Sequence, residues 1–422
     1  MKFNRRRFLQ AFGASAAVAI TPSMVKAASA PKVVVIGGGF AGATAAKYLR
    51  MWSNHTIDVT LVDAKAQHTS CVMSNLVLNG QLKLQQLKLS YSSLASIHGV
   101  HVKRDKAISI DGDTKVVELR DQGSLRYDYL LLATGIGFQK KGEVDFNLTP
   151  HAWIAGGQTN RLATMVNTLG PSSTFVMTVP KSPYRCPPGP YERACLVADI
   201  LKRRGYDNGD AKVIVLDANA SIQAEEHTFS TAFEGIYGNI IEYIPNAPVQ
   251  SVDSVNRVVA TDMGDFTGDV VNYIPDQRAP GFVRRSGVTN SGNWAPVDPV
   301  TYASTLPGFE SVYVIGDIQG TGQPKSGHMA NAQAKVCADA IIRTVDDKSN
   351  YTDDRLKNIT TNSACYSPIT YDKASYLTAN FRYDKDQEKM VLTQLGEAEH
   401  WNTENYQDMF GWAGNLFTDS FH

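Results

Sequence analysis

Two cysteines stand in settings that point to redox chemistry. Cys186 lies beside residues 187–190, which read Pro-Pro-Gly-Pro, and Cys365 lies within residues 363–367, which read Ser-Ala-Cys-Tyr-Ser. Proline has a fixed φ and no backbone N–H, so the first run is neither a helix interior nor a central strand. It predicts a stiff loop that holds one thiol in place. If both thiols reach a flavin, they predict sulfur redox chemistry.

The elements that would position these thiols begin with a dinucleotide-binding pattern. Residues 32–36 predict a buried strand, residues 43–50 a helix, and residues 59–62 a second strand that ends at Asp63. The turn after the first strand reads Gly-x-Gly-x-x-Gly and is formed by Gly37, Gly39 and Gly42. Such glycines let the backbone approach a pyrophosphate, and the helix N-terminus faces its negative charge. The acid after the second strand would bind the ribose hydroxyls.

Two later segments favour FAD over NAD as the bound dinucleotide. Residues 127–135 end in Ala-Thr-Gly and residues 311–317 end in Gly-Asp, each after a predicted strand. Both resemble segments of flavoproteins with two dinucleotide domains, in which the late acid binds the flavin ribityl chain. The predicted cofactor-binding residues here are Ala133, Thr134, Gly135, Gly316 and Asp317. Lys325 precedes a predicted helix over residues 329–343, whose N-terminus would face the flavin and stabilise its reduced anion.

A second α/β unit follows, but its phosphate loop is altered. Residues 173–179 and 212–217 predict strands, with a helix over residues 191–204 between them. In a nicotinamide-binding domain a glycine-rich loop would follow the first strand. Here residues 180–190 carry prolines and Cys186 instead, and proline lacks the N–H that a pyrophosphate needs. We therefore expect the chain not to use NAD.

These patterns predict an α/β fold with two Rossmann-like dinucleotide-binding domains and a C-terminal α+β interface domain. The FAD domain is split in sequence. The predicted domains are residues 1–27 as a signal peptide, 32–155 and 271–345 as the two parts of the FAD domain, 156–270 as the second Rossmann-like domain, and 351–422 as the C-terminal domain. Within the last, residues 371–383 read as strand. The acidic end, residues 401–422, favours a helix that packs over the flavin or against a partner rather than on a membrane.

Composition and the N-terminal sequence limit which partners and which cellular compartment are expected. Lys plus Arg and Asp plus Glu each number 41 in 422 residues, so nothing indicates nucleic acid or an anionic membrane. Residues 4–10, Asn-Arg-Arg-Arg-Phe-Leu-Gln, carry a twin-arginine pattern ahead of an apolar stretch, residues 11–20, that is too short to span a membrane. We expect export of the folded protein to the periplasm, without membrane insertion. The odd number of cysteines, five, predicts at least one thiol outside any disulfide.

The chain resembles the flavoprotein subunit of flavocytochrome c sulfide dehydrogenase over essentially its whole length, the C-terminal domain included. The motifs that carry the resemblance are residues 185–193, residues 71–75, and residues 324–327 ahead of 330–333. The resemblance implies a periplasmic enzyme that oxidises sulfide and passes electrons from FAD to a separate c-type cytochrome subunit. No Cys-x-x-Cys-His occurs in the sequence, so we expect no haem on this chain.

The resemblance also implies roles for individual residues. Cys186 and Cys365 match a redox disulfide beside the flavin, and the alternative is an inert structural disulfide. Because Cys365 follows the Gly-Asp half of the FAD domain, we expect it to lie nearer the flavin and Cys186 to receive sulfide. Glu192 matches a proton-transfer group, although an acid in the first turn of a helix is favourable for structural reasons alone. Cys71 matches a cysteine that can join the flavin 8α-methyl covalently, and the alternative is a free loop thiol.

Other residues and other functions stay open at this stage. Cys195 and Cys337 are expected to be buried and inert, because they lie at apolar positions of predicted helices. The histidines have no metal-like spacing, so no metal site is predicted, and His328 alone lies close to the flavin-facing helix. The alternatives are a sulfide:quinone oxidoreductase, a type II NADH dehydrogenase, or a non-catalytic FAD subunit that transfers electrons.

Overall fold

The computed structural model describes residues 29–422, so the predicted signal peptide lies outside the described residues. Its first sheet is parallel, in the order β19-β9-β1-β2-β5. The strands are β1 (Lys32–Ile36), β2 (Asp58–Asp63), β5 (His101–Arg104), β9 (Tyr129–Leu132) and β19 (Val312–Val314). Because β19 pairs with β9, segments from both predicted parts of the FAD domain share one sheet. The apolar runs that predicted β1 and β2 are buried, as both faces of a parallel sheet require.

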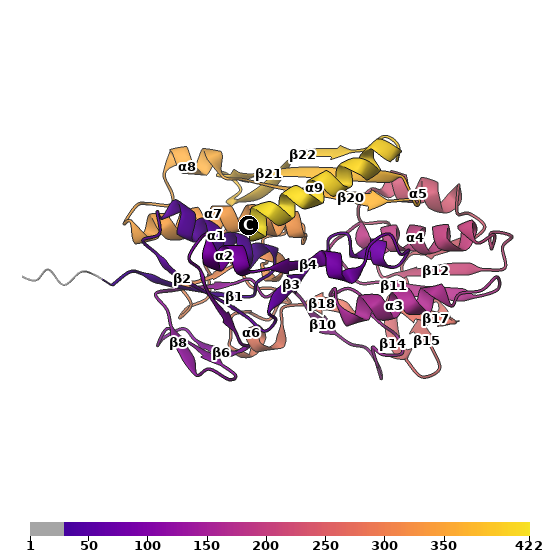
Figure 1. The fold of residues 1–422 in the computed structure, drawn as a ribbon, viewed down its shortest axis with the longest axis horizontal. Coiled ribbons are helices and arrows are strands. Elements are labelled where there is room, and N and C mark those ends of the chain that lie inside the picture. Colours follow the sequence, from indigo (N-terminus) through magenta and orange to yellow (C-terminus); the bar gives the residue numbers. More distant parts are fainter. Residues whose placement is uncertain (1–28) are drawn as a thin grey trace, which may run out of the picture. The chain divides into compact units, whose positions relative to one another are not determined.

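Two helices cover one face of this sheet and pack against each other. Helix α1 spans Phe40–Trp52 and helix α7 spans Gly327–Val345, and Figure 1 shows them side by side above the strands. Both begin earlier than the sequence predicts, because the glycine turn leads directly into α1 and the Ser326 side chain caps α7 by accepting a hydrogen bond from the Met329 N–H. Alanines on both helices are fully buried, which allows the close approach.

The second α/β unit, at the right of Figure 1, has a parallel sheet in the order β13-β12-β11-β17. Its elements are α3 (Gly157–Asn167), β11 (Thr174–Val179), α4 (Gly189–Arg203), β12 (Lys212–Asp217), α5 (Glu226–Glu234), β13 (Ile241–Ile244) and β17 (Val270–Asn272). The prediction of a second Rossmann-like unit is therefore confirmed. The last strand, β17, spans the predicted boundary at residues 270 and 271.

The C-terminal segment forms an antiparallel sheet and a long helix. Its elements are α8 (Asp353–Asn358), β20 (Thr360–Pro368), β21 (Ala374–Asp384), β22 (Lys389–Glu397) and α9 (Thr403–Phe421). Helix α9 runs back along α1, where Phe421 is fully buried against Phe40 and Asp419 pairs with Lys335 of α7 at 2.8 Å. The tail thus forms a helix, as predicted, and packs on the helices of the first unit. Its packing over the flavin or against a partner stays a prediction.

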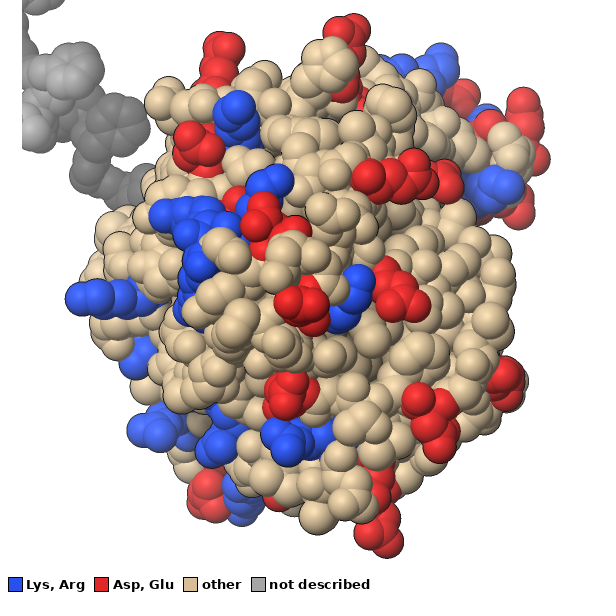
Figure 2. All heavy atoms as spheres, turned by 90° about the vertical axis from the view of Figure 1, so that its right-hand side faces the viewer, with Lys and Arg blue, Asp and Glu red and all other residues tan. Residues whose placement is uncertain are grey.

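Shorter elements connect these units. They are β3 (Gln67–Thr69), η1 (Ser74–Val77), η2 (Leu84–Leu87), β4 (Lys88–Ser90), α2 (Ser92–Ser96), β6 (Ala107–Asp111), β7 (Val116–Leu119), β8 (Ser124–Arg126), β10 (Gly137–Gln139), β14 (Val249–Asp253), β15 (Val258–Thr261), β16 (Gly264–Thr267), β18 (Asp276–Arg278), α6 (Gly281–Arg285) and η3 (Gly316–Ile318). No helix among residues 29–422 is long and apolar enough to cross a membrane. On the face drawn in Figure 2, basic and acidic side chains lie scattered, in several places next to each other, among wide uncharged areas.

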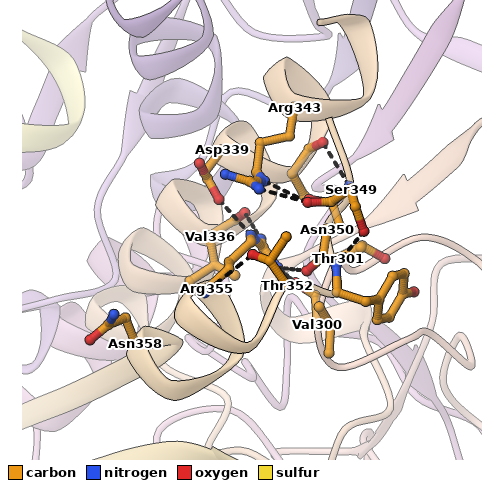
Figure 3. Close-up of polar contacts among 12 residues, drawn as sticks. Val300, Thr301, Val336, Asp339, Arg343, Ser349, Asn350, Thr352, Arg355 and Asn358 are labelled. Atoms are coloured by element: carbon orange, nitrogen blue, oxygen red, sulfur yellow. Dashed lines mark hydrogen bonds and ion pairs between the residues drawn. The ribbon is translucent and has the colours of Figure 1, made fainter. Parts of the chain in front are cut away.

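A buried arginine fixes the C-terminal segment to the first unit. Arg355 of α8 donates from Nε to the Asp339 carboxylate of α7 at 2.7 Å and from Nη1 to the Val300 and Asn350 carbonyl oxygens (Figure 3). A buried guanidinium is stable only when its donors are satisfied, so these bonds fix where β20 starts. Because Cys365 lies on β20, this clamp helps to set the position of that thiol.

Candidate functional site

A groove of about 920 Å³ opens at the carboxyl ends of the strands of the first sheet. This is where parallel α/β sheets bind dinucleotides. Most of the predicted cofactor residues line the groove: Gly37, Gly39, Asp63, Cys71, Ala133, Thr134, Gly135, Gly316 and Asp317. Segments far apart in the sequence therefore meet around one hollow.

The glycines of the turn have different tasks. Gly37 has φ +101° and a Cβ there would lie 2.5 Å from the Ala133 carbonyl oxygen, while a Cβ at Gly42 would lie 1.8 Å from the Gly37 oxygen. These two glycines allow the tight turn and its packing. A Cβ at Gly39 would meet nothing nearer than 3.6 Å, so this position leaves the start of α1 open toward the groove. The arrangement fits a bound pyrophosphate.

Two acids line the groove. Asp63 accepts hydrogen bonds from the Gly38 N–H at 2.6 Å and the Lys65 N–H at 2.7 Å, so it fixes the glycine turn and keeps lone pairs for a ribose. Asp317 lies 3.7 Å from Arg185, and burial raises the pKa of its carboxyl while Arg185 and Lys325 oppose that rise. Both positions fit the predicted contacts with a dinucleotide.

Lys325 differs from the prediction, because it does not line the groove. Its ammonium donates to the carbonyl oxygens of Asp317 and Gln319, each at 2.8 Å, and lies 3.8 Å from the ring centre of Trp294. The side chain is 4% exposed, and burial lowers its pKa to about 8. Lys325 thus holds the turn that presents Asp317, and its contact with a cofactor stays a prediction.

A second cavity, of about 800 Å³, joins the groove at the start of α7. Cys71, Arg185, Ser326 and Gly327 line both hollows. Cys186, Cys365 and Glu192 line the second, so it brings together the predicted catalytic residues and Cys71. All five cysteines are free thiols in this structure, and the disulfide stays a prediction. Cys195 and Cys337 are fully buried in two different cores, as predicted.

The loop that carries Cys186 is held from two sides. The Cys186 N–H donates to the Lys325 carbonyl oxygen at 2.7 Å, which ties the loop to the segment before α7. Cys186 has φ +57°, a conformation that costs a non-glycine residue free energy and persists only where neighbours impose it. A Cβ at Gly189 would lie 2.9 Å from the Cys186 sulfur. The absence of a side chain at Gly189 therefore leaves the space that the sulfur occupies.

Burial controls the ionisation of the two cysteines. It raises the pKa of Cys186 well above its ordinary value, with further rises from charge on Cys365 and Glu192 and an opposing effect of Arg185. It raises the pKa of Cys365 to about 12, with contributions from Glu225 and Glu192. Both sulfurs are therefore neutral at pH 7, and a thiolate set free here is high in free energy. Such a thiolate reacts readily with an electron-poor acceptor.

Glu192 is buried in the first turn of α4, with 8% of its surface exposed. Burial raises its pKa to about 8, opposed by a hydrogen bond with Asn75 and by the charge of Arg193. A carboxyl with such a pKa exchanges protons near neutral pH. Glu192 is therefore both an acid at a helix N-terminus, where negative charge is stabilised, and a group that can transfer protons.

Sequence analysis gave no role to Arg193, which also lines the cavity. It is 2% exposed and donates to the Asn75 side chain at 2.9 Å and the Ala152 carbonyl oxygen at 2.7 Å. Among the described residues it forms no ion pair with a carboxylate within 4 Å, so its charge acts on the cavity. The dipeptide Glu192-Arg193 at a helix start was the only signal in the sequence.

His328, singled out in the sequence, links three elements at the edge of the cavity. Its Nδ1 accepts from the Ala364 N–H at 3.0 Å and from the Trp412 indole N–H at 3.3 Å. Burial lowers its pKa, so the ring is neutral. The residue joins α7, β20 and α9 next to Cys365. No cluster of side chains suited to a metal ion occurs in the described part of the chain.

Comparison with known proteins agrees with this geometry. The family model described as pyridine nucleotide-disulphide oxidoreductase matches residues 31–146, and the one described as sulfide dehydrogenase [flavocytochrome c] flavoprotein chain, central, matches residues 159–275. The crystal structure of sulfide:quinone oxidoreductase from Aquifex aeolicus superposes with a TM-score of 0.75 at 17% identity, over 93% of this chain and 92% of that chain. The fold and the two hollows define a flavoprotein of the disulphide oxidoreductase class.

Similar protein sequences show which family within the disulphide oxidoreductase class this chain resembles. The sulfide-quinone reductase of Aquifex aeolicus is 21% identical over 415 residues, which are 92% of each chain. The sulfide dehydrogenase [flavocytochrome c] flavoprotein chain of Chlorobaculum thiosulfatiphilum is 52% identical over 46 residues, which are 11% of this chain and 94% of that sequence. This chain belongs to the family of sulfide dehydrogenase flavoprotein chains, which is similar to the sulfide:quinone oxidoreductases.

The position of the Cys186 sulfur can be tested at Gly189. We expect Gly189→Ala to displace the sulfur, since the new methyl group would lie 2.9 Å from it. Mild oxidation should then give at least about tenfold less of the Cys186–Cys365 cross-linked peptide, a change of about 1.4 kcal/mol, measured by mass spectrometry. Gly157→Ala is the matched control, because Gly157 also starts a helix and a Cβ there meets no atom within 4 Å. Equal yields from both variants would contradict the geometry.

The raised pKa of Glu192 predicts a pH-dependent stability. Between its ordinary value of 4.5 and about 8 the folded protein binds a proton that the unfolded chain releases, so the free energy of unfolding falls as pH rises through this window. Glu192→Gln should remove roughly 1 kcal/mol per pH unit of that dependence. Urea midpoints at pH 5.5 and 8 measure it. Glu404→Gln, an exposed first-turn acid of α9, should leave the dependence unchanged; an unchanged slope in Glu192→Gln would refute the assignment.

Proposed function

We propose that this protein is an exported FAD enzyme that oxidises sulfide through a Cys186–Cys365 disulfide and passes the electrons to a c-type cytochrome. The observation that carries the proposal is the single cavity into which Cys186 and Cys365 come from distant segments, continuous with the dinucleotide groove. The names of the relatives support sulfide as the substrate. The twin-arginine pattern supports export to the periplasm.

In the proposed reaction, hydrosulfide attacks the Cys186 sulfur of the disulfide. The S–S bond breaks, Cys186 becomes a persulfide, and Cys365 leaves as a thiolate, so that no electron is lost in this step. Glu192, with its pKa of about 8, can take the proton of the persulfide. FAD bound in the groove supplies a two-electron acceptor that can release electrons one at a time. A second hydrosulfide that attacks the outer sulfur would carry it away as hydrogen disulfide and leave Cys186 as a thiolate. The bond between Cys186 and Cys365 would then form again and give up two electrons, which the acceptor bound in the groove would take.

The groove residues divide the task of holding FAD. The turn with Gly37 and Gly39 would receive the pyrophosphate, Asp63 the ribose, and Asp317 the ribityl chain. Cys71 lines both hollows, which supports the proposal that it can join the flavin covalently. Such a bond would prevent loss of the cofactor outside the cytoplasm.

The second Rossmann-like unit supports a function without NAD. The acid at the end of β12, Asp217, is the position that would bind a nicotinamide dinucleotide ribose. It is fully buried and accepts hydrogen bonds from the Tyr191 hydroxyl at 2.7 Å, the Tyr243 hydroxyl at 2.9 Å and the Asn219 N–H at 2.8 Å. The hydrogen-bond acceptors of Asp217 are therefore used by donors of the protein itself, which disfavours a hydrogen bond from this carboxylate to a ribose.

A quinone is the second candidate acceptor. It is favoured by the similarity to sulfide-quinone reductase over 92% of the chain. The higher local identity to the flavocytochrome c relative favours a cytochrome, and the acids Glu404 and Asp408 on exposed turns of α9 disfavour a membrane surface. We therefore propose the cytochrome.

The cysteine mechanism predicts the behaviour of two variants. Cys186→Ser and Cys365→Ser should each keep bound FAD and lose reduction of the flavin by sulfide by at least about a thousandfold, as expected when a nucleophilic residue is removed. Anaerobic stopped-flow absorbance measures this, with sulfide and NADH mixed separately. Cys337→Ala is the control, because Cys337 is buried in the core of the first unit and lines neither hollow. Flavin bleaching by NADH alone, or normal reduction in either serine variant, would contradict the proposal.

The electron acceptor is tested by reoxidation. Sulfide-reduced protein should be reoxidised at least about tenfold faster by a soluble c-type cytochrome than by a short-chain ubiquinone at equal concentration, a difference of about 1.4 kcal/mol in activation free energy. Stopped-flow absorbance of the haem and the flavin gives both rates. The reverse order would assign the protein to the quinone reductases.

A further inference from the structure

Glu225 is a second buried acid near the cysteines that the proposed reaction does not use. Its side chain is 1% exposed and its backbone has φ +52°, just before α5. One carboxylate oxygen accepts from the Ser367 hydroxyl at 2.5 Å, while the other is buried with no hydrogen-bond partner among the described residues. Strain together with an unpaired buried oxygen costs free energy, which is typical of a functional residue.

The contact with Ser367 places Glu225 beside Cys365. Ser367 and Cys365 are two residues apart on β20, so their side chains lie on the same face of the sheet. On that face Ser375 of β21 stands opposite Ser367 and contacts Thr228 of α5 at 3.4 Å. The start of α5 thus docks on the face that presents Cys365 to the cavity.

Two acids act on Cys365 from different elements. Glu225, ahead of α5, and Glu192, on α4, both raise the pKa of the Cys365 thiol, after the larger effect of burial. Glu225 also raises the pKa of Glu192. Burial raises the pKa of Glu225 itself to about 7, which the hydrogen bond from Ser367 and the nearby Ser375 hydroxyl oppose. Its charge therefore changes within the physiological range.

We propose that Glu225 is a positioning residue for Cys365, which holds β20 through Ser367 and sets, by its own charge, how readily Cys365 becomes a thiolate. The proposal rests on the proposed function, because it concerns the cysteine that leaves as a thiolate there. Protonated Glu225 lets Cys365 carry negative charge at lower free energy, and ionised Glu225 opposes it. No bond to the sulfur is made or broken by Glu225.

Other charged and titratable groups also face this region. They are Glu192 and Arg193 of α4, Arg185 and Cys186 of the proline loop, Cys71, His328 of α7, and Glu397 of β22. Of these, Glu397 raises the pKa of Glu225, and Cys186 and Cys365 act on each other. A test must therefore change Glu225 alone.

The test is the pH dependence of alkylation at Cys365. The holoenzyme is reduced with a phosphine, treated with iodoacetamide between pH 6 and 9.5, and the Cys365 peptide is quantified by mass spectrometry. Only the thiolate reacts. In the wild type the alkylation rate of Cys365 should rise less steeply with pH above about pH 7, because Glu225 ionises there. In Glu225→Gln, which stays neutral, the rate should keep rising and reach about tenfold the wild-type rate at pH 9, equivalent to one pKa unit.

Two further variants make the result decisive. Glu226→Gln removes an exposed charge from the adjacent position and should leave the wild-type profile unchanged. Ser367→Ala removes a hydrogen bond that stabilises ionised Glu225, so the pH at which the alkylation rate begins to rise less steeply should increase. This variant tests the proposal if Glu225→Gln does not fold. Identical profiles in wild type, Glu225→Gln and Ser367→Ala would overturn the proposal. Because the assay contains no sulfide, it is independent of whether sulfide reduces the flavin.

Discussion

The site depends on one backbone contact between the two α/β units, the hydrogen bond from the Cys186 N–H to the Lys325 carbonyl oxygen. It joins the proline loop of the second unit to the segment that starts α7 in the first. The Lys325 side chain holds the turn of Asp317 through two more carbonyl oxygens. A single residue therefore fixes the thiol on one side and the dinucleotide groove on the other. The position of the Cys186 backbone relative to the groove is therefore set by a backbone hydrogen bond, which varies less than a side-chain rotamer.

The second constraint is the low polarity of the cavity that this contact creates. Burial raises the pKa values of Cys186, Cys365, Glu192 and Glu225, so every one of these groups favours its neutral form. The cation of Arg193 stays buried among neutral acceptors and limits the rise at Glu192. A thiolate formed in such surroundings has few ways to be stabilised. Its negative charge is released most readily to an electron acceptor in the adjoining groove.

The local parts of this arrangement could be predicted from the sequence, and the rest could not. The strands β1 and β12 and the glycine turn follow from apolar runs and short spacings, which act within a few residues. Cys186 and Cys365 were paired through the resemblance to a family, because no local pattern relates them. Lys325 was predicted to face the cofactor since it precedes a helix, but its ammonium instead binds carbonyl oxygens of the turn six and eight residues before it. Arg193 and Glu225 could not be predicted as site residues, because their role depends on burial in the folded protein. Such burial of a single charged residue leaves no periodic pattern in the sequence.

The altered phosphate loop and the cysteine cavity are two aspects of one structural change. In a nicotinamide domain the N-terminus of α4 would receive a phosphate. Here the loop carries prolines, α4 starts against the Cys186 sulfur at Gly189, and its first turn places Glu192 and Arg193 in the cavity. The same turn provides Tyr191. Its hydroxyl donates a hydrogen bond to Asp217, the acid that would bind the ribose in a nicotinamide domain. The residues that build the thiol site are thus the residues that replace the phosphate loop of a nicotinamide domain, which supports the proposal that this chain takes electrons from sulfur rather than from a nicotinamide.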